Sequence, residues 1–398
     1  LDRLVVNTIK TLSMDAVQAA NSGHPGMPMG TADAASVLWR HFLVTDPQEP
    51  DFVDRDRFIL SAGHGSMLLY ALLHLSGHDL PMEEIKNFRQ MGSKTPGHPE
   101  VGVTAGVETT TGPLGQGLAN GVGMAMAEAY LAAHFNRPGH TIVNHMTYGI
   151  CSDGDLQEGI SHEAASLAGH LGLGKLVFLW DDNSISIDGS TDLSFTEDVA
   201  KRFEAYGWHV LSADGHDHAS VASALEEART ESSKPSLICT RTRIGHGSPN
   251  KEGTAASHGA PLGEEEIRLT KEAIGWPYTE AFHVPGDVYG AFDEMAARGR
   301  ARKRAWESAF SAYSEAFPEL AAMWKDIHSG DGLPEDIEAS LPQWAPDTKE
   351  ATRASSGKVI NALAETLPML WGGSADLSGS NKTYVNGHPP FQKDTPAG

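Results

Sequence analysis

Residues 148–187, YGICSDGDLQEGISHEAASLAGHLGLGKLVFLWDDNSISI, decide the fold of this chain. An apolar run, Thr141–Cys151, ends in a Ser-Asp-Gly turn, and a helical pattern begins near Leu156. Asp155 lies three residues before Glu158, a spacing that predicts a capping box at the start of this helix. We therefore expect a buried strand that passes through a short turn into a helix.

A second apolar run, Lys175–Trp180, follows the helix and ends in an Asp-Asn pair. Two strands joined by one helix predict a parallel βαβ unit with a right-handed connection, so the carboxyl ends of the strands lie side by side. Asp153, Asn183 and the backbone carbonyl of Ile185 would then offer hard oxygen ligands, which suit Mg²⁺ or Ca²⁺. The neighbouring helix N-terminus favours an anion such as a diphosphate.

Length and composition narrow the class of protein. The chain has 398 residues, 40% of them hydrophobic, and 42 glycines, which favours an α/β enzyme of more than one domain. A formal charge of −22 argues against nucleic acid or an anionic membrane as a partner. Two cysteines, Cys151 and Cys239, give no disulfide framework, and with no apolar run long enough for a membrane helix we expect a cytoplasmic protein. The chain begins with Leu1, so we also expect its true N-terminus to lie upstream.

Helical and strand patterns alternate along the rest of the chain, which predicts an α/β fold with a parallel sheet. The predicted helices are 4–20, a segment through Tyr70, 118–133, 195–206, 218–230, 264–274, 287–325 and 353–367. The further predicted strands are 57–61, 208–211, 236–240 and 369–371. Proline-rich residues in 330–346 indicate a linker, so we expect a first domain over 1–325, a linker over 326–350 and a second domain that begins at 351.

Four histidines lie in loops stiffened by glycine or proline, in the segments NSGHPG (His24), AGHGS (His64), KTPGHP (His98) and ASHGAPLG (His258). An isolated histidine in such a loop is more often a polar helix end than a ligand, so the residues alone leave both alternatives open. The run ETTTGPLGQG, residues 108–117, is rich in glycine but lacks the Gly-Lys-Ser/Thr ending of a nucleotide P-loop. An Asp-Gly turn such as 153–154 usually only connects two elements.

Taken together, these segments resemble the transketolase family of thiamine diphosphate enzymes. The segments SDGDLQEGISHEAASLAGH and DDNSISIDG match its metal and diphosphate motif, and the four histidine loops, GPLGQG and GGSADL (372–377) follow in the family order. The resemblance runs along essentially all 398 residues. It implies a thiamine diphosphate-binding fold, with a diphosphate-binding domain followed by the start of a pyrimidine-binding domain.

The resemblance also implies roles for individual residues. His24, His64, His98 and His258 would be catalytic, with His24, His98, His258, Arg353 and Ser380 binding the sugar phosphate. Asp153, Asn183 and Ile185 would bind Mg²⁺, Ca²⁺ or Mn²⁺. The implied cofactor contacts are His64, Gly112, Pro113, Leu114, Gly154, Glu158, Asn183, Ile187, Ile244 and His258. Glu158 would in addition lie between the two active sites of a dimer, while His246 and Asp376 receive no role.

The function that the resemblance implies is transfer of a two-carbon ketol unit from a ketose phosphate to an aldose phosphate, within the pentose phosphate pathway or the Calvin cycle. It also implies a homodimer with active sites at the subunit interface. The family's catalytic glutamate and ring pocket would lie beyond residue 398, so we expect a piece of a longer chain that is inactive alone. The alternatives are a dihydroxyacetone synthase, a deoxyxylulose phosphate synthase and a non-catalytic cofactor-binding subunit.

Overall fold

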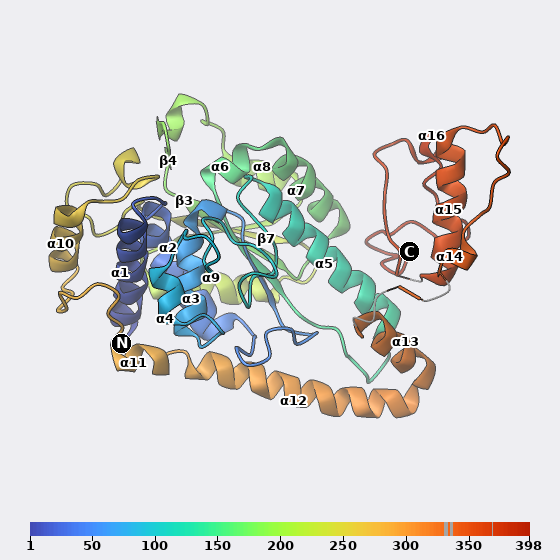
Figure 1. Cartoon of the computed structure of the whole chain (residues 1–398), viewed down its shortest axis with the longest axis horizontal. Helices are drawn as coiled ribbons and strands as arrows, with labels where there is room; N and C mark the ends of the chain where they lie inside the picture. Colours follow the sequence, from blue (N-terminus) through green and yellow to red (C-terminus); the bar gives the residue numbers. More distant parts are fainter. Residues whose placement is uncertain (330–332, 335–336, 368) are drawn as a thin grey trace.

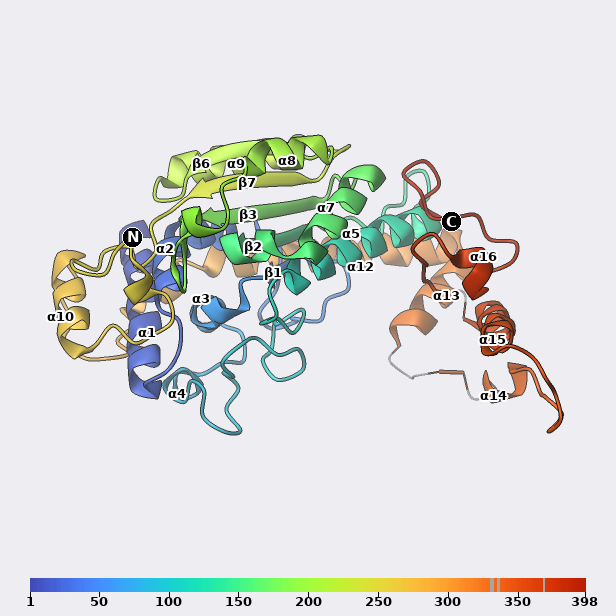
Figure 2. The ribbon, with the colours of Figure 1, turned by 90° about the horizontal axis from the view of Figure 1, so that it is seen from above.

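A five-stranded parallel sheet in the order β1-β2-β3-β7-β6 forms the centre of the structure (Figures 1 and 2). The computed structural model describes residues 1–329, 333–334, 337–367 and 369–398. The strands are β1 (Arg57–Leu60), β2 (Thr147–Ser152), β3 (Leu176–Asp182), β6 (His209–Asp214) and β7 (Ser236–Arg241). Since β2 and β3 are parallel neighbours, with Ser152 opposite Asp181, the predicted parallel βαβ unit is confirmed.

Alternate side chains of β3 point to opposite faces of the sheet and divide the core in two. Val177 and Leu179 pack with the helices of one face, and Phe178 and Trp180 pack with those of the other. The first face is covered by α1 (Asp2–Ala20), α2 (Gly26–Val37), α3 (Ser66–Leu75) and α9 (His218–Thr230). The second is covered by α5 (Gln116–Phe135), α7 (Gly159–Leu171) and α8 (Val199–Ala205). The predicted α/β fold is therefore confirmed as a sheet between two helical layers.

The capping box that we predicted from Asp155 and Glu158 is wrong in its position. The short helix α6 (Asp153–Gln157) begins directly after β2, and its capping box is formed by Ser152 and Asp155. Glu158 is instead the exposed N-cap residue of α7, and its side chain makes no capping hydrogen bond. The strand passes into the helix without an intervening turn, so Asp155 reaches back to Ser152.

The carboxylate of Asp155 joins three chain segments at the end of the sheet. One oxygen accepts hydrogen bonds from the hydroxyl of Ser61 (2.7 Å) and the backbone amide of Gly115 (2.8 Å). The other accepts from the amide and the hydroxyl of Ser152 (2.8 and 3.0 Å). Burial raises the pKa of this fully buried carboxyl, and these hydrogen bonds oppose the rise. Asp155 thus fixes the end of β1 and the start of α5 against the start of α6.

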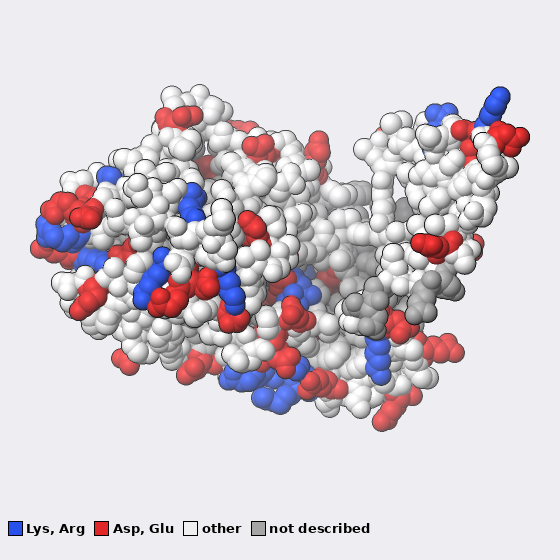
Figure 3. All heavy atoms as spheres, in the orientation of Figure 1, with Lys and Arg blue, Asp and Glu red and all other residues white. Residues whose placement is uncertain are grey.

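Helix α12 (Asp293–Ala316) runs along the edge of the domain and holds the N-terminal segments in place (Figure 1). Arg298 donates to the carbonyls of Arg40 and Leu43, both at 3.0 Å. Arg302 donates to the carboxylate of Asp54 at 2.6 Å. On the face shown in Figure 3, one group of basic side chains lies at the lower edge, where α12 runs, with acidic side chains beside it.

The C-terminal residues form a separate lobe that contains α14 (Ile337–Ser340), α15 (Thr352–Thr366) and α16 (Ser378–Asn381) (Figures 1 and 2). The strand that we predicted over 369–371 is wrong. Within the described residues no strand lies beside this segment, so its backbone lacks the pairing that a strand requires. Trp371 instead stacks on the ring of Tyr130, with 5.6 Å between the centroids. Parts of the expected linker, 330–332 and 335–336, lie outside the described residues.

The remaining helices and strands are short or peripheral. They are the π-helix Leu38–Phe42, the 3-10 turns Gly63–Gly65, Thr191–Leu193 and Ala255–Ser257, α4 (Met82–Lys86), the hairpin β4 (Ile185–Ser186) and β5 (Gly189–Ser190), α10 (Glu264–Ala273), α11 (Gly286–Gly290) and α13 (Pro318–His328). The predicted helix 287–325 is thus three helices. Among the described helices, none is both long enough and apolar enough to cross a membrane.

Replacing Asp155 by Asn tests its role as a structural junction. One carboxylate oxygen becomes an NH₂ group that faces two donors, so we expect the free energy of unfolding to fall by about 2–4 kcal/mol. Glu226→Gln on the exposed side of α9 is the matched control, with an expected change within about 0.5 kcal/mol. Urea unfolding of both variants measures the difference, and equal stabilities would contradict the assignment.

Candidate active site

The functional candidates gather where the parallel strands end. His64 follows β1, Asp153 follows β2, Asn183 follows β3 and Ile244 follows β7. Because the strands are parallel, these four positions lie at the same edge of the sheet. The sequence patterns predicted this convergence for Asp153 and Asn183.

The four loop histidines lie together at this edge. The ring of His24 lies 5.2 Å from His64, 5.7 Å from His258 and 6.5 Å from His98, measured between centroids. The rings of His64 and His258 are stacked at 5.2 Å. Since the four residues come from loops far apart in the sequence, the tertiary structure creates the cluster, and the expected convergence is found.

Burial keeps these imidazoles neutral. It is the largest cause that lowers the pKa of His24 to about 4, with smaller contributions from His258, Arg89 and His98. Burial also holds the pKa of His64 well below its ordinary value and lowers that of His98 and His258. The Nδ1 atoms of His24 and His258 are buried and have no hydrogen-bond partner. Such atoms favour a polar ligand in the cleft, because an unsatisfied buried nitrogen is costly.

Glycines bring the backbone close to the histidines at two places. A Cβ at Gly112, whose φ is 143°, would lie 3.1 Å from the ring of His98. A Cβ at Gly26 would lie 2.5 Å from the carbonyl of Ser257 and 2.6 Å from the side chain of Ile244. Gly26 therefore requires glycine, because a larger residue would displace the backbone that precedes His258. At Gly112 the positive φ and the close ring of His98 both disfavour a larger residue.

A buried acidic group lies at the ends of β2 and β3. Asp153 accepts hydrogen bonds from the indole of Trp180 (2.9 Å) and the amide of Ser184 (3.0 Å). Burial raises the pKa of its carboxyl to about 7, and the neighbouring carboxylates of Asp181 and Asp182 add to the rise. Asp181 is fully buried as well, and burial raises its pKa to about 6.

These residues fit a divalent cation. Several buried carboxyl groups close together repel one another when ionised, and a cation between them and a diphosphate removes that cost. The side-chain oxygen of Asn183 accepts from the amide of Ile185 (2.9 Å) and retains a second lone pair. A carboxylate, an amide oxygen and a backbone carbonyl form a donor set that suits Mg²⁺ or Ca²⁺ better than a softer metal.

The other predicted cofactor contacts lie around this edge. A Cβ at Gly154 would lie 2.9 Å from the side chain of Leu114, which follows the exposed Pro113. A Cβ at Gly115 would lie 3.0 Å from the Cβ of Glu158. The exposed side chain of Ile187 lies beside Gly259, where an added Cβ would meet both Ile187 (3.2 Å) and the ring of His24 (3.4 Å).

Arg353 and Ser380 are not brought to the histidine cluster within this chain. Both are exposed, Arg353 on α15 and Ser380 on α16, in the C-terminal lobe. Figures 1 and 2 agree that this lobe lies at the opposite end of the molecule from α1 and α2. Asp376 lies in the same lobe, is exposed, and has a φ of 60°.

Three residues of the acidic site carried no distinct sequence pattern. Trp180 orients Asp153 through its indole N–H. Asp181 accepts hydrogen bonds from Asn183 (2.8 Å) and from the hydroxyl of Thr242. The Asp-Asp-Asn run at the end of the strand was the sequence feature that could have pointed to Asp181 as part of the site. Trp180 was read only as the end of a buried strand, and Thr242 only as the start of a loop.

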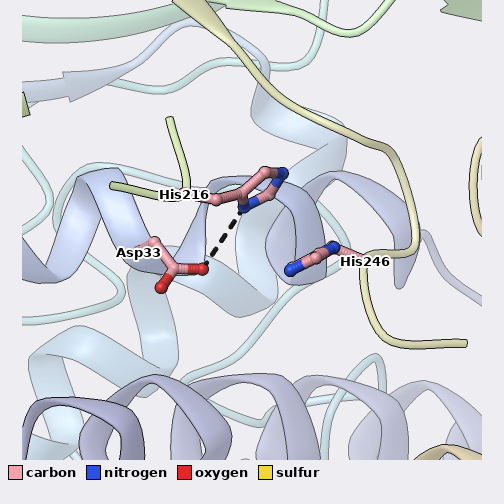
Figure 4. Close-up of side chains that lie close together, drawn as sticks. All are labelled: Asp33, His216 and His246. Carbon is pink, nitrogen blue, oxygen red and sulfur yellow. Dashed lines mark hydrogen bonds and ion pairs between the residues drawn. The ribbon is translucent and has the colours of Figure 1, made fainter. Parts of the chain in front are cut away.

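His246 belongs to a second cluster, with Asp33 and His216 (Figure 4). Their potential ligand atoms all lie within 4.8 Å of one another. However, Nε2 of His216 accepts a hydrogen bond from the amide of Arg243 (3.1 Å), so the proton of this ring is on Nδ1, which faces Asp33 at 3.5 Å. A metal ion would require that nitrogen to be unprotonated.

Asp33 has two further polar partners. Lys10 lies 3.5 Å from its carboxylate, and Nε2 of His218 lies 3.2 Å away. Burial alone would raise the pKa of Asp33, but the hydrogen bonds from His216 and His218 hold it well below its ordinary value. The cluster is therefore an ion-pair network that ties the loop over 243–252 to α2.

Comparison with known proteins identifies the class to which this fold and cleft belong. Residues 1–334 match the family described as "Transketolase, thiamine diphosphate binding domain", and the chain belongs to this family. It is 55% identical over 399 aligned positions to the transketolase of Halalkalibacterium halodurans and 57% identical over 396 to transketolase 1 of Escherichia coli. These alignments cover 100% and 98% of this chain, but only 60% and 59% of the relatives.

Solved structures agree with this assignment. The transketolase of Leishmania mexicana superposes with a TM-score of 0.96 at 47% identity, covering 100% of this chain and 59% of that protein. A transketolase of Pichia stipitis in complex with sedoheptulose-7-phosphate gives 0.94 at 44% identity, covering 99% and 58%. The chain therefore spans about 60% of the length of the relatives that it matches.

The Asp33 network predicts a pH-dependent contribution to stability. The hydrogen bond to Asp33 is the largest cause that raises the pKa of His218. A histidine whose pKa is higher in the folded state than its unfolded value of about 6.5 stabilises the folded protein, and this contribution is fully present at pH values below about 6.5. The contribution is lost as the pH rises through the pKa of the folded state. His218→Ala should therefore lower the melting temperature more at pH 5.5 than at pH 8.5. Exposed His388→Ala is the control, and an equal loss at both pH values would refute this account.

Proposed function

We propose that this chain is the cofactor-binding part of a transketolase that moves a two-carbon ketol unit from a ketose phosphate, such as xylulose 5-phosphate, to an aldose phosphate, such as ribose 5-phosphate. The main support is the cluster of four half-buried histidines with lowered pKa values beside a buried acidic site, in a chain that matches transketolases along its length. The complex of a Pichia stipitis relative with sedoheptulose-7-phosphate supports sugar phosphates as substrates. The pentose phosphate pathway or the Calvin cycle would use such a reaction.

The proposed cofactors are thiamine diphosphate and a divalent cation, Mg²⁺, Ca²⁺ or Mn²⁺. Asp153, Asn183 and the carbonyl of Ile185 would hold the cation. When bound, thiamine diphosphate supplies a carbanion centre and electron sink for breaking and forming the carbon–carbon bond. The residues proposed to contact this cofactor are His64, Gly112, Pro113, Leu114, Gly154, Glu158, Asn183, Ile187, Ile244 and His258.

The histidines would bind substrate and move protons. We assign His24 and His98 to the substrate side of the cleft, and His64 and His258 to the side nearer the diphosphate. A neutral imidazole can accept a proton at one nitrogen while the other donates a hydrogen bond, which suits general acid–base chemistry on a sugar hydroxyl. The lowered pKa of His24 keeps it in this neutral form at working pH.

Domain organisation and assembly are part of the same proposal. Residues 1–325 would form the diphosphate-binding domain, 326–350 the linker and 351–398 the start of the pyrimidine-binding domain. The protein would act as a homodimer with each active site at the subunit interface, so that Arg353 and Ser380 bind the sugar phosphate there and Glu158 lies between the two sites. We propose the cytosol as its compartment, where thiols such as Cys151 and Cys239 stay reduced.

A panel of donors and acceptors tests the reaction. The transketolase of which this chain is proposed to be the cofactor-binding part, with thiamine diphosphate and Mg²⁺, is expected to convert xylulose 5-phosphate and ribose 5-phosphate to sedoheptulose 7-phosphate and glyceraldehyde 3-phosphate, whereas residues 1–398 alone are expected to bind the cofactor without turnover. Formaldehyde as the best acceptor would favour a dihydroxyacetone synthase, and pyruvate as the donor would favour a deoxyxylulose phosphate synthase. Cofactor binding by the whole protein without turnover on any pair would favour a non-catalytic subunit and contradict the proposed function.

Calorimetry tests the metal site. Asp153→Ala removes the one anionic ligand of the proposed set and leaves the diphosphate charge uncompensated, so thiamine diphosphate affinity at fixed Mg²⁺ should fall by roughly 10²-fold or more. Asp188→Asn, at an exposed position between β4 and β5, is the control and should bind thiamine diphosphate with unchanged affinity. Unchanged affinity in Asp153→Ala, with an intact fold by circular dichroism, would remove Asp153 from the site.

A further inference from the structure

Arg89 occupies a strained backbone position next to the histidine cleft. Its φ of 62° lies in the left-handed region, which a residue with a long side chain rarely adopts. The backbone amide of Arg89 donates to the carbonyl of Thr95 (2.9 Å) and closes the loop that leads to His98. Such a conformation persists only when surrounding contacts fix it, and it is found most often at functional sites.

The guanidinium of Arg89 joins the two loops that carry the substrate-side histidines. Its Nη1 donates to the hydroxyl of Ser22 at 2.8 Å, two residues before His24. Its other edge lies against Gly97, the residue before His98, where an added Cβ would be 3.0 Å from Nε and 3.2 Å from Cζ. A Cβ at this position would press on the guanidinium, so Arg89 packs closely between the two loops.

Few other charged groups face the two rings. His24 is surrounded by His64, His98 and His258, and Arg89 is the permanent charge that acts on it. For His98, burial is the largest cause of its lowered pKa, and Arg89 is the other.

Tyr70 and Glu100 complete this side of the cleft. The hydroxyl of Tyr70 lies 2.8 Å from the carbonyl of Pro96 and 3.3 Å from that of His98. Burial and the charge of Glu100 raise the pKa of Tyr70, so this hydroxyl stays neutral and cannot replace the charge of Arg89.

We propose that Arg89 is a positioning residue for ketol transfer, because its guanidinium clamps the His24 loop to the His98 loop and fixes both rings for the substrate. This inference rests on the proposed function and deepens it. The planar guanidinium suits this role because one of its edges donates a hydrogen bond to Ser22 while the other packs on Gly97. The positive charge serves a second purpose, because it disfavours protonation of the two imidazoles.

Two variants separate the clamp from the charge. Arg89→Gln removes the charge, and Arg89→Lys keeps the charge but not the planar fork. Lys94→Gln is the matched control, because it removes a positive charge from the same loop, where Lys94 pairs with exposed Asp79. Each variant is made in the whole transketolase that contains this chain, loaded with thiamine diphosphate and Mg²⁺, and assayed for kcat/KM across pH. The His98 ring is titrated by NMR with labelled histidine, and His98→Gln identifies its signal.

We expect kcat/KM for the sugar phosphates to fall about 10²-fold in both Arg89 variants, because misplaced rings lose their alignment with the substrate. Thiamine diphosphate affinity should stay within about twofold of the wild type, since the proposed cation ligands are not touched. In Arg89→Gln the titration of His98 and the acid limb of kcat/KM should move to higher pH, while Arg89→Lys should titrate like the wild type.

Three results would overturn the inference. The first is an unchanged kcat/KM and His98 titration in Arg89→Gln, and the second is an equal effect of Lys94→Gln. The third is a parallel loss of melting temperature and cofactor affinity with no shift of His98, which would show a merely structural role. A wild-type protein without turnover would instead overturn the proposed function, and the NMR titration would still decide whether Arg89 controls His98.

Discussion

The rest of the site depends on the hydrogen bonds that converge on the buried carboxylate of Asp155. Through Ser61 this carboxylate holds the end of β1, after which His64 follows. Through Gly115 it holds the GPLGQG segment where α5 begins, and through Ser152 it holds the strand end that precedes Asp153. One buried acceptor with four donors therefore fixes the relative positions of a histidine loop, a glycine loop and a proposed cation ligand. Burial makes each of these bonds costly to lose.

Burial has opposite consequences on the two sides of the cleft. On the histidine side it removes charge, since desolvation lowers the pKa of His24 to about 4 and that of its neighbours as well. On the acidic side burial raises the pKa of Asp153 to about 7, and the neighbouring carboxyl groups of Asp181 and Asp182 add to the rise. A cation and a diphosphate would balance the acidic side without charging the histidines. The same low-polarity environment thus suits metal-assisted anion binding next to neutral proton carriers.

Local sequence patterns were sufficient where local geometry dominates. The parallel βαβ unit around 148–187 was predicted because apolar runs, a helical period and a strand-end Asp-Gly are all local features. The same reasoning placed the capping box wrongly, because it allowed for a turn that the chain does not make between β2 and α6. It also predicted a strand at 369–371, where Trp371 packs on Tyr130 and no strand among the described residues pairs with the backbone.

The sequence by itself determined the α/β class, the strand-end position of Asp153 and Asn183, and the four rigid histidine loops, since each depends on residues close together in the chain. Only the tertiary structure decided which of these loops meet. It brought together His24, His64, His98 and His258, left Arg353 and Ser380 in a separate lobe, and stacked His246 on His216 beside Asp33. It also placed the guanidinium of Arg89 against Ser22, which lies 67 residues earlier in the sequence. Such contacts depend on how the helices pack on the sheet, and no local pattern specifies that packing.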